Sequence, residues 1–113
     1  MAAASISCDA YPRHTRDLVV VARGMSFEIE NQSGVPNPVI PLRAGERVRL
    51  VLKNEAPGLL HDFVIPAWNV EVDPIRAGEH REITFAVPDT AGRFEYHCRP
   101  HSSLMSGFVE VTR

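Results

Sequence analysis

The sequence contains few cysteines, no long hydrophobic run and little net charge. Only 2 of its 113 residues are cysteine, and no CxxC redox motif occurs. No run of about eighteen apolar residues is present, so the sequence predicts no transmembrane segment. The 12 basic and 14 acidic residues give a formal net charge of -2, without the broad basic face that nucleic acid partners require. A Ser/His/Asp nucleophile motif and a phosphate-binding loop are also absent from the sequence.

The length and composition fit one globular domain. A chain of 113 residues can build one hydrophobic core but not two, and its contents of 44% hydrophobic and 23% charged residues are ordinary. Residues 1–17 are small and polar, so we expect an irregular N-terminal arm followed by a single domain at residues 18–113. Met1–Ser7 lacks the charged segment and long apolar core of a secretory signal. The chain is therefore either cytoplasmic or, as we prefer, a mature form with an added start methionine, and composition alone does not decide between the two.

Short hydrophobic segments separated by turn formers predict an all-β protein. Segment 47–54 alternates apolar and polar residues, as a half-solvated antiparallel strand does, and Pro41 is tolerated best in an edge strand. Turn formers recur roughly every eight to twelve residues, and no segment has a helical period, which predicts a Greek-key β-sandwich or barrel of seven or eight strands. The expected strands are 18–22, 25–30, 39–42, 47–54, the interrupted segment 64–72, 80–87, 94–98 and 108–111.

Three soft or borderline metal ligands lie close together near the C-terminus. They are Cys98, His101 and Met105. Thiolate and thioether sulfur select copper and zinc over hard cations, and imidazole suits both metals. The same set would be a poor site for calcium or magnesium, which prefer oxygen ligands. The segment therefore predicts a site for a soft metal ion.

The pattern around these ligands predicts how they are held. Phe94, Tyr96 and Cys98 alternate with polar residues, which places Cys98 at the end of an inward-facing row on a strand. Pro100 cannot donate to a β-ladder, so the strand ends there. The two ligands that follow then lie in the turn before the next strand, which begins after Gly107.

A fourth ligand must come from a distant strand. His61 is the best candidate, because it lies between a turn at 57–60 and a strongly apolar segment. Two imidazoles and one thiolate in a trigonal plane, with a weak axial methionine, form the blue-copper arrangement. We therefore predict a metal site of His61, Cys98, His101 and Met105.

The segment Gly92-x-Phe94-x-Tyr96-x-Cys98-x-Pro100-His101-x-x-x-Met105-x-Gly107 resembles the C-terminal copper loop of the cupredoxins, the plastocyanin and azurin group of type 1 copper proteins. Segments 61–66 and 70–75 are similar to the cupredoxin domain of cytochrome oxidase subunit II. The likeness covers about residues 18–112 and implies that His61, Cys98 and His101 are equatorial ligands and Met105 the axial one. The binuclear oxidase centre needs two cysteines in its loop. Because this loop holds only Cys98, one copper ion per chain is expected.

The resemblance implies a small carrier of single electrons and not an enzyme. A redox partner, such as a cytochrome or a copper oxidase or reductase, is expected to dock near His101, amid apolar residues such as Leu59, Leu60 and Leu104. The resemblance also implies a location outside the cytoplasm, in the periplasm.

Two residues are candidates to hold the ligands in place. A ligating histidine usually donates its second ring N–H to a partner that fixes its orientation. Asp62 directly follows His61, and Asn54 precedes the turn at 57–60, so either can brace this region.

Other readings of the same residues stay open. Cys98 could form a disulfide with Cys8, or the protein could carry copper as cargo. His97 points to the opposite face of the strand from Cys98, so we do not expect it to bind the same copper ion. Copper nitrite reductases resemble this sequence in having a histidine directly before the cysteine, where it binds a second, catalytic copper. Such a site would need two further histidines, for which His14 and His80 are available.

Overall fold

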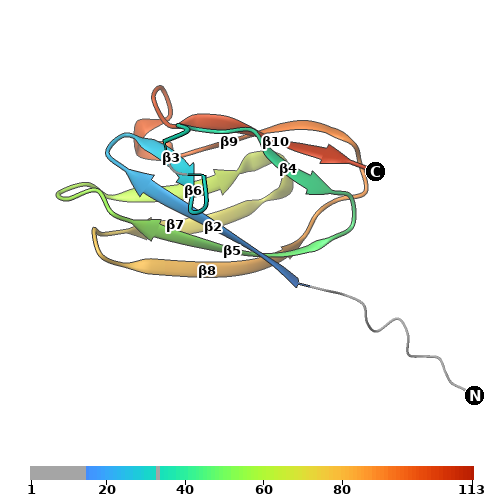
Figure 1. Ribbon diagram of the computed structural model, residues 1–113, viewed down its shortest axis with the longest axis horizontal. Coiled ribbons are helices and arrows are strands. Elements are labelled where there is room, and N and C mark those ends of the chain that lie inside the picture. The colour runs from blue at the N-terminus through green and yellow to red at the C-terminus, as the bar shows by residue number, and fades with distance from the viewer. Residues whose placement is uncertain (1–14, 33) are drawn as a thin grey trace, which may run out of the picture.

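The computed structural model describes residues 15–32 and 34–113. In these residues, nine strands form a five-stranded and a four-stranded sheet that pack face to face, which confirms the all-β sandwich (Figure 1). The first sheet has the strand order β4 (Ile40–Arg43), β10 (Ser106–Thr112), β9 (Gly92–His97), β6 (His61–Ile65) and β7 (Val70–Ile75). The second has the order β3 (Ser26–Ile29), β2 (Thr15–Arg23), β5 (Arg47–Asn54) and β8 (His80–Ala86).

The remaining regular elements are two short 3-10 helices, η1 (Pro66–Trp68) and η2 (Arg99–His101). Each begins with a proline in its first turn, where the missing N–H costs no hydrogen bond. Among the described residues, no helix has the length and hydrophobicity that crossing a membrane requires.

Three details differ from the expectations. Helix η1 divides the central segment into β6 and β7, so there is one strand more than the seven or eight predicted. Strand β2 begins at Thr15, so residues 15–17 of the expected arm belong to a sheet, and the rest of the arm lies outside the described residues. Strand β5 is antiparallel only to β8, since its other neighbour, β2, runs parallel to it. A strand's own sequence does not specify the direction of its neighbours.

Prolines occupy the edges of the five-stranded sheet. Pro41 lies in β4 and Pro74 in β7, the two strands at the ends of the sheet order. Proline lacks the N–H that a central strand needs on both sides, so these edge positions are the tolerated ones. The expected edge strand at 39–42 is thus confirmed.

An aromatic cluster fills the core between the sheets. The rings of Phe27, Phe63 and Tyr96 are fully buried, and their centroids lie 5.2 to 5.9 Å apart. Phe63 lies two residues after His61 in β6, and Tyr96 lies two residues before Cys98 at the end of β9. The predicted metal ligands therefore rest on a closely packed core.

Candidate metal centre

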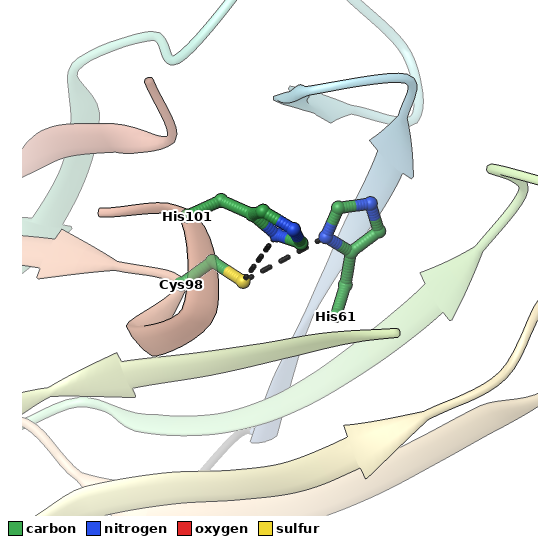
Figure 2. Close-up of side chains that lie close together, drawn as sticks. All are labelled: His61, Cys98 and His101. Atoms are coloured by element: carbon green, nitrogen blue, oxygen red, sulfur yellow. Dashed lines mark hydrogen bonds between the residues drawn. The ribbon is translucent and has the colours of Figure 1, made fainter. Parts of the chain in front are cut away.

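Three of the four predicted ligands meet at one end of the sandwich. His61 is the first residue of β6, Cys98 directly follows β9, and His101 ends η2. Figure 2 shows the two imidazole rings and the cysteine sulfur pointing toward one another. The side chains of His61 and Cys98 are fully buried, and that of His101 is half-buried. The structure thus brings together residues that are 37 positions apart in the sequence.

The distances within this group suit a metal ion. The Sγ atom of Cys98 lies 3.6 Å from Nδ1 of His61 and 3.6 Å from Nδ1 of His101. All three candidate ligand atoms lie within 4.8 Å of one another. A zinc-sized ion, about 2.3 Å from a thiolate and about 2.0 Å from an imidazole nitrogen, would hold those two atoms about 3.7 Å apart at a trigonal angle. Both separations from the sulfur therefore fit an ion shared with each imidazole.

A hydrogen bond at Nε2, the ring nitrogen that does not face Cys98, fixes the tautomer of His61. Its Nε2 lies 2.9 Å from the carbonyl oxygen of Gly24, in the turn between β2 and β3. A carbonyl oxygen can only accept, so Nε2 carries the proton and, in the neutral ring, Nδ1 keeps its lone pair. Burial lowers the pKa of His61, which favours this neutral form. The lone pair of Nδ1 is therefore available to a metal ion, and the hydrogen bond at Nε2 holds the ring in place, as such bonds commonly do for ligating histidines.

Cys98 is a buried free thiol. Burial raises the pKa of this thiol, while hydrogen bonds from the backbone N–H groups of Asp62 and His101 act in the opposite direction. Coordination deprotonates a thiol outright, so a bound cation would compensate for the burial. No disulfide to Cys98 is present in the described part of the chain, and Cys8 lies outside that part.

Met105, the predicted axial ligand, is fully buried in the core next to this loop. Its backbone is tied to the two other ligands of the loop. The N–H of Cys98 donates to the carbonyl oxygen of Met105, and the N–H of Met105 donates to the carbonyl oxygen of His101. Ligation by the Met105 sulfur stays a prediction.

Both expected bracing residues make hydrogen bonds next to the ligands, although the ring N–H of His61 goes to the Gly24 carbonyl oxygen and to neither of them. The Asn54 amide is buried and donates to the carbonyl oxygens of Leu59 and Ile75, 2.8 and 2.9 Å away, so it fixes the turn before His61. The buried Asp62 carboxylate accepts hydrogen bonds from Arg99, which directly follows Cys98.

Sequence reasoning missed three further supports. They are the Gly24 carbonyl oxygen, Asn37 and the guanidinium of Arg99. The Asn37 side chain accepts from the N–H of Phe27 and donates to the carbonyl oxygen of Leu104. Asn37 has a positive φ of 45°, a conformation in which asparagine is enriched. Its place between two prolines was the available signal, whereas nothing local marks Gly24 or Arg99.

His97 faces away from the group, as expected. Its Nδ1 lies 3.8 Å from the Glu95 carboxylate. His97 belongs to no cluster of candidate metal ligands among residues 15–32 and 34–113, where His61, Cys98 and His101 form the single such cluster. His80 is exposed in β8, and His14 lies outside the described residues.

Two exposed leucines lie close in the sequence to the two histidines of the site. Leu104, three residues after His101, is 60% exposed, and Leu60, directly before His61, is 50% exposed. Exposed leucines of this kind can take part in contacts with other proteins.

The sequence matches the family model of copper binding proteins of the plastocyanin/azurin family over residues 40–112. The chain belongs to this family. The resemblance to the cupredoxins is thereby confirmed, and the protein binds copper. A search of curated proteins gave no match.

Several solved structures have the same fold as this protein. Rusticyanin from Thiobacillus ferrooxidans has a TM-score of 0.64 and 23% identity, over 87% of this chain and 77% of that chain. Auracyanin from the photosynthetic bacterium Roseiflexus castenholzii has a TM-score of 0.67 and 15% identity, over 88% of this chain and 97% of that chain. A chain of a heme-copper terminal oxidase dimer has a TM-score of 0.69 and 18% identity, over 87% and 65% of the two chains. At these identities the likeness shows the fold alone.

Proposed function

We propose that this protein carries single electrons on one type 1 copper ion, held by His61, Cys98 and His101 with Met105 as a weak axial ligand. The observation that carries the proposal is the convergence of two imidazole Nδ1 atoms on one buried cysteine sulfur, each 3.6 Å from it. Copper supplies the one-electron chemistry, because it is stable as Cu(II) and as Cu(I). The proposed role is electron transfer alone, with no substrate and no catalysed reaction.

The chain's own residues would keep the site rigid. His61 is fixed by the end of β6 and by the Gly24 carbonyl oxygen, and Cys98 is fixed by the end of β9. Ligands on the ends of regular elements are held more firmly than ligands in free loops. A site that rearranges little between the two copper states favours fast electron transfer. Because Cys98 and His61 are buried, the surrounding core would also exclude water from that side of a bound ion.

Electrons would enter and leave through His101, the half-buried member of the group. The exposed leucines that lie close to the two histidines in the sequence, Leu60 and Leu104, would form the docking surface for a redox protein such as a cytochrome or a copper oxidase or reductase. Brief redox encounters use small interfaces, which a patch of this kind can provide. We place this exchange outside the cytoplasm, in the periplasm, on the strength of the family resemblance.

The experiment is the addition of Cu(II) to the copper-free protein, followed by the visible spectrum. An intense charge-transfer band is expected, because it requires a copper–thiolate bond, and Cys98→Ser should abolish the band while the circular dichroism spectrum stays unchanged. His61→Ala should also weaken or abolish it. His80→Ala is the matched control, since it removes an exposed histidine from β8 and should leave the band intact. No band in the wild-type protein would overturn the proposal.

Metal counting and voltammetry separate the alternatives. An electron carrier should hold one copper per chain and keep it through reversible reduction. Loss of the ion on reduction would instead indicate a protein that carries copper as cargo. A second copper per chain that disappears in His97→Ala would indicate a reductase.

A further inference from the structure

Asp62 is a buried carboxylate beside the metal centre. Its side chain is 1% exposed, and it directly follows His61. A buried charge is tolerated only when it is paired and hydrogen-bonded. Both of its oxygens meet this condition through one residue: Oδ1 accepts from the backbone N–H of Arg99 at 2.8 Å, and Oδ2 accepts from Nε of Arg99 at 2.7 Å.

Arg99 directly follows Cys98 and is the first residue of η2. The first N–H groups of a helix have no partner within the helix, and Cys98 at the cap position provides no side-chain bond. Asp62 supplies that missing acceptor from another strand. The Arg99 guanidinium is 46% exposed and also lies 3.4 Å from the Glu71 carboxylate of β7. The pair therefore joins β6 and β7 to the start of the ligand loop.

Each partner of this ion pair is covalently next to a ligand of the proposed site, and the two carry opposite charges. A negative charge near copper favours Cu(II) and lowers the reduction potential, whereas a positive charge favours Cu(I) and raises it. Such effects are strong where water is excluded and weak where solvent screens the charge. The Asp62 side chain is buried, the Arg99 side chain is half-exposed, and the two are 2.7 Å apart. Each charge is therefore partly compensated by the other.

We propose that Asp62 and Arg99 are positioning residues of the copper site, and that their ion pair sets its reduction potential by balancing two opposite charges beside the ligands. The inference rests on the proposed function, since a reduction potential requires a reversible copper couple. The pair fixes the distance between the segments that carry His61 and Cys98. One contact therefore controls both the position of these two ligands and the charge next to them.

The test measures the reduction potential of the copper-loaded full chain by voltammetry at pH 8. Asp62→Asn keeps an oxygen for the N–H of Arg99 but removes the negative charge, so the potential should rise. Arg99→Gln keeps the backbone N–H but removes the positive charge, so the potential should fall. The double variant should return toward the wild-type value. Shifts of both single variants in the same direction, or no shift in either, would overturn the inference.

The opposite signs separate a charge effect from a merely structural role, because loosening the site would move both variants alike. Arg49→Gln is the matched control. It removes the same charge from an exposed pair with Asp17 in the other sheet, and it should leave the potential unchanged. Arg99 is half-exposed, so its variant should fold even if Asp62→Asn does not, and its downward shift alone tests the sign.

Amide hydrogen exchange of the copper-free protein tests the positioning part without any metal. The N–H of Arg99 should be protected in the wild-type protein and in Asp62→Asn, and should exchange faster in Asp62→Ala. Equal exchange in all three proteins would contradict the positioning role. If the wild-type protein gives no reversible couple, the proposed function fails while the exchange result still decides the role of Asp62. If the couple is present and the two potentials do not separate in sign, this inference alone fails.

Discussion

The backbone N–H of Cys98 donates a hydrogen bond to the carbonyl oxygen of Met105, 3.1 Å away. Two more main-chain bonds continue the connection: the N–H of His101 donates to the carbonyl oxygen of Cys98 at 3.1 Å, and the N–H of Met105 donates to that of His101 at 2.9 Å. All three bonds join backbone groups, so they do not depend on which side chains the loop carries. The ligand loop is therefore closed by its own backbone, and a side chain in it can be changed without opening it.

Met105→Leu tests the axial ligand. Leucine has a similar volume, so the copper-free variant should lose less than about 1.5 kcal/mol of unfolding free energy. Copper and its visible band should be retained, because the thiolate and both imidazoles remain. The reduction potential should rise, since a weak donor to Cu(II) is lost. An unchanged potential would show that Met105 is not bound to the metal.

Tyr96→Phe tests the support beneath the cysteine. The Tyr96 hydroxyl is buried and donates to the carbonyl oxygen of Pro38 at 2.6 Å, and burial raises the pKa of Tyr96, so the donor stays protonated. Phenylalanine would leave that oxygen without this donor, at a cost of about 1 to 2 kcal/mol. Urea unfolding of the copper-free protein measures the difference. A free energy equal to that of the wild-type protein would mean that water replaces the hydroxyl at no cost.

The loop that carries Cys98, His101 and Met105 could be predicted from the sequence because its information is local. Alternation of Phe94, Tyr96 and Cys98 fixes which side faces the core, and Pro100 marks where the strand stops. The structure confirms both, with Tyr96 and Cys98 buried and η2 starting at Arg99. Residue type and spacing were sufficient here.

Contacts between distant strands could not be predicted in this way. His61 was chosen from its place between a turn and an apolar segment and from the family resemblance, not from any ligand spacing around it. Its partner Gly24 lies 37 residues earlier in a turn that carries no side-chain signal. The pairing of Asp62 with Arg99 spans the same number of residues. The contact between Asp62 and Arg99 follows from the order of strands in the five-stranded sheet, which places β6 beside β9, whereas the contact between His61 and Gly24 follows from the packing of one sheet on the other. Strand order is a property of the whole chain, and no single segment encodes it.

Gly107→Ala tests the close approach of β10 to the aromatic core. A Cβ at position 107 would lie against the Tyr96 hydroxyl oxygen and 2.5 Å from its Cζ. The Tyr96 ring is buried and its hydroxyl is bound to Pro38, so it has little freedom to move. Overpacking of this kind costs about 1 to 3 kcal/mol. Phe108→Ala, at an exposed neighbouring position, is the control and should cost less in the same unfolding experiment.

Glu46→Gln tests how pH acts on the end of the sandwich where β2 begins. The Glu46 carboxylate accepts two hydrogen bonds from Arg16, at 3.0 and 2.8 Å, and one from the backbone N–H of Arg43 at 2.8 Å. These contacts join β2 of one sheet to the end of β4 in the other. They lower the pKa of Glu46 below its ordinary value of 4.5, chiefly through the hydrogen bonds from Arg16.

Because the folded-state pKa of Glu46 is lowered, its contribution to stability is fully present above the unfolded value of 4.5 and is lost as the pH falls through the folded value. At pH 7 the Glu46→Gln variant should therefore unfold about 1 kcal/mol more easily than the wild-type protein, as expected for a bidentate pair at the surface. The difference should shrink toward pH 3. Urea unfolding of the copper-free proteins at both pH values measures it, with exposed Glu82→Gln as the control. An equal difference at pH 7 and pH 3 would mean that the contact with Arg16 stabilises the fold by packing rather than by charge.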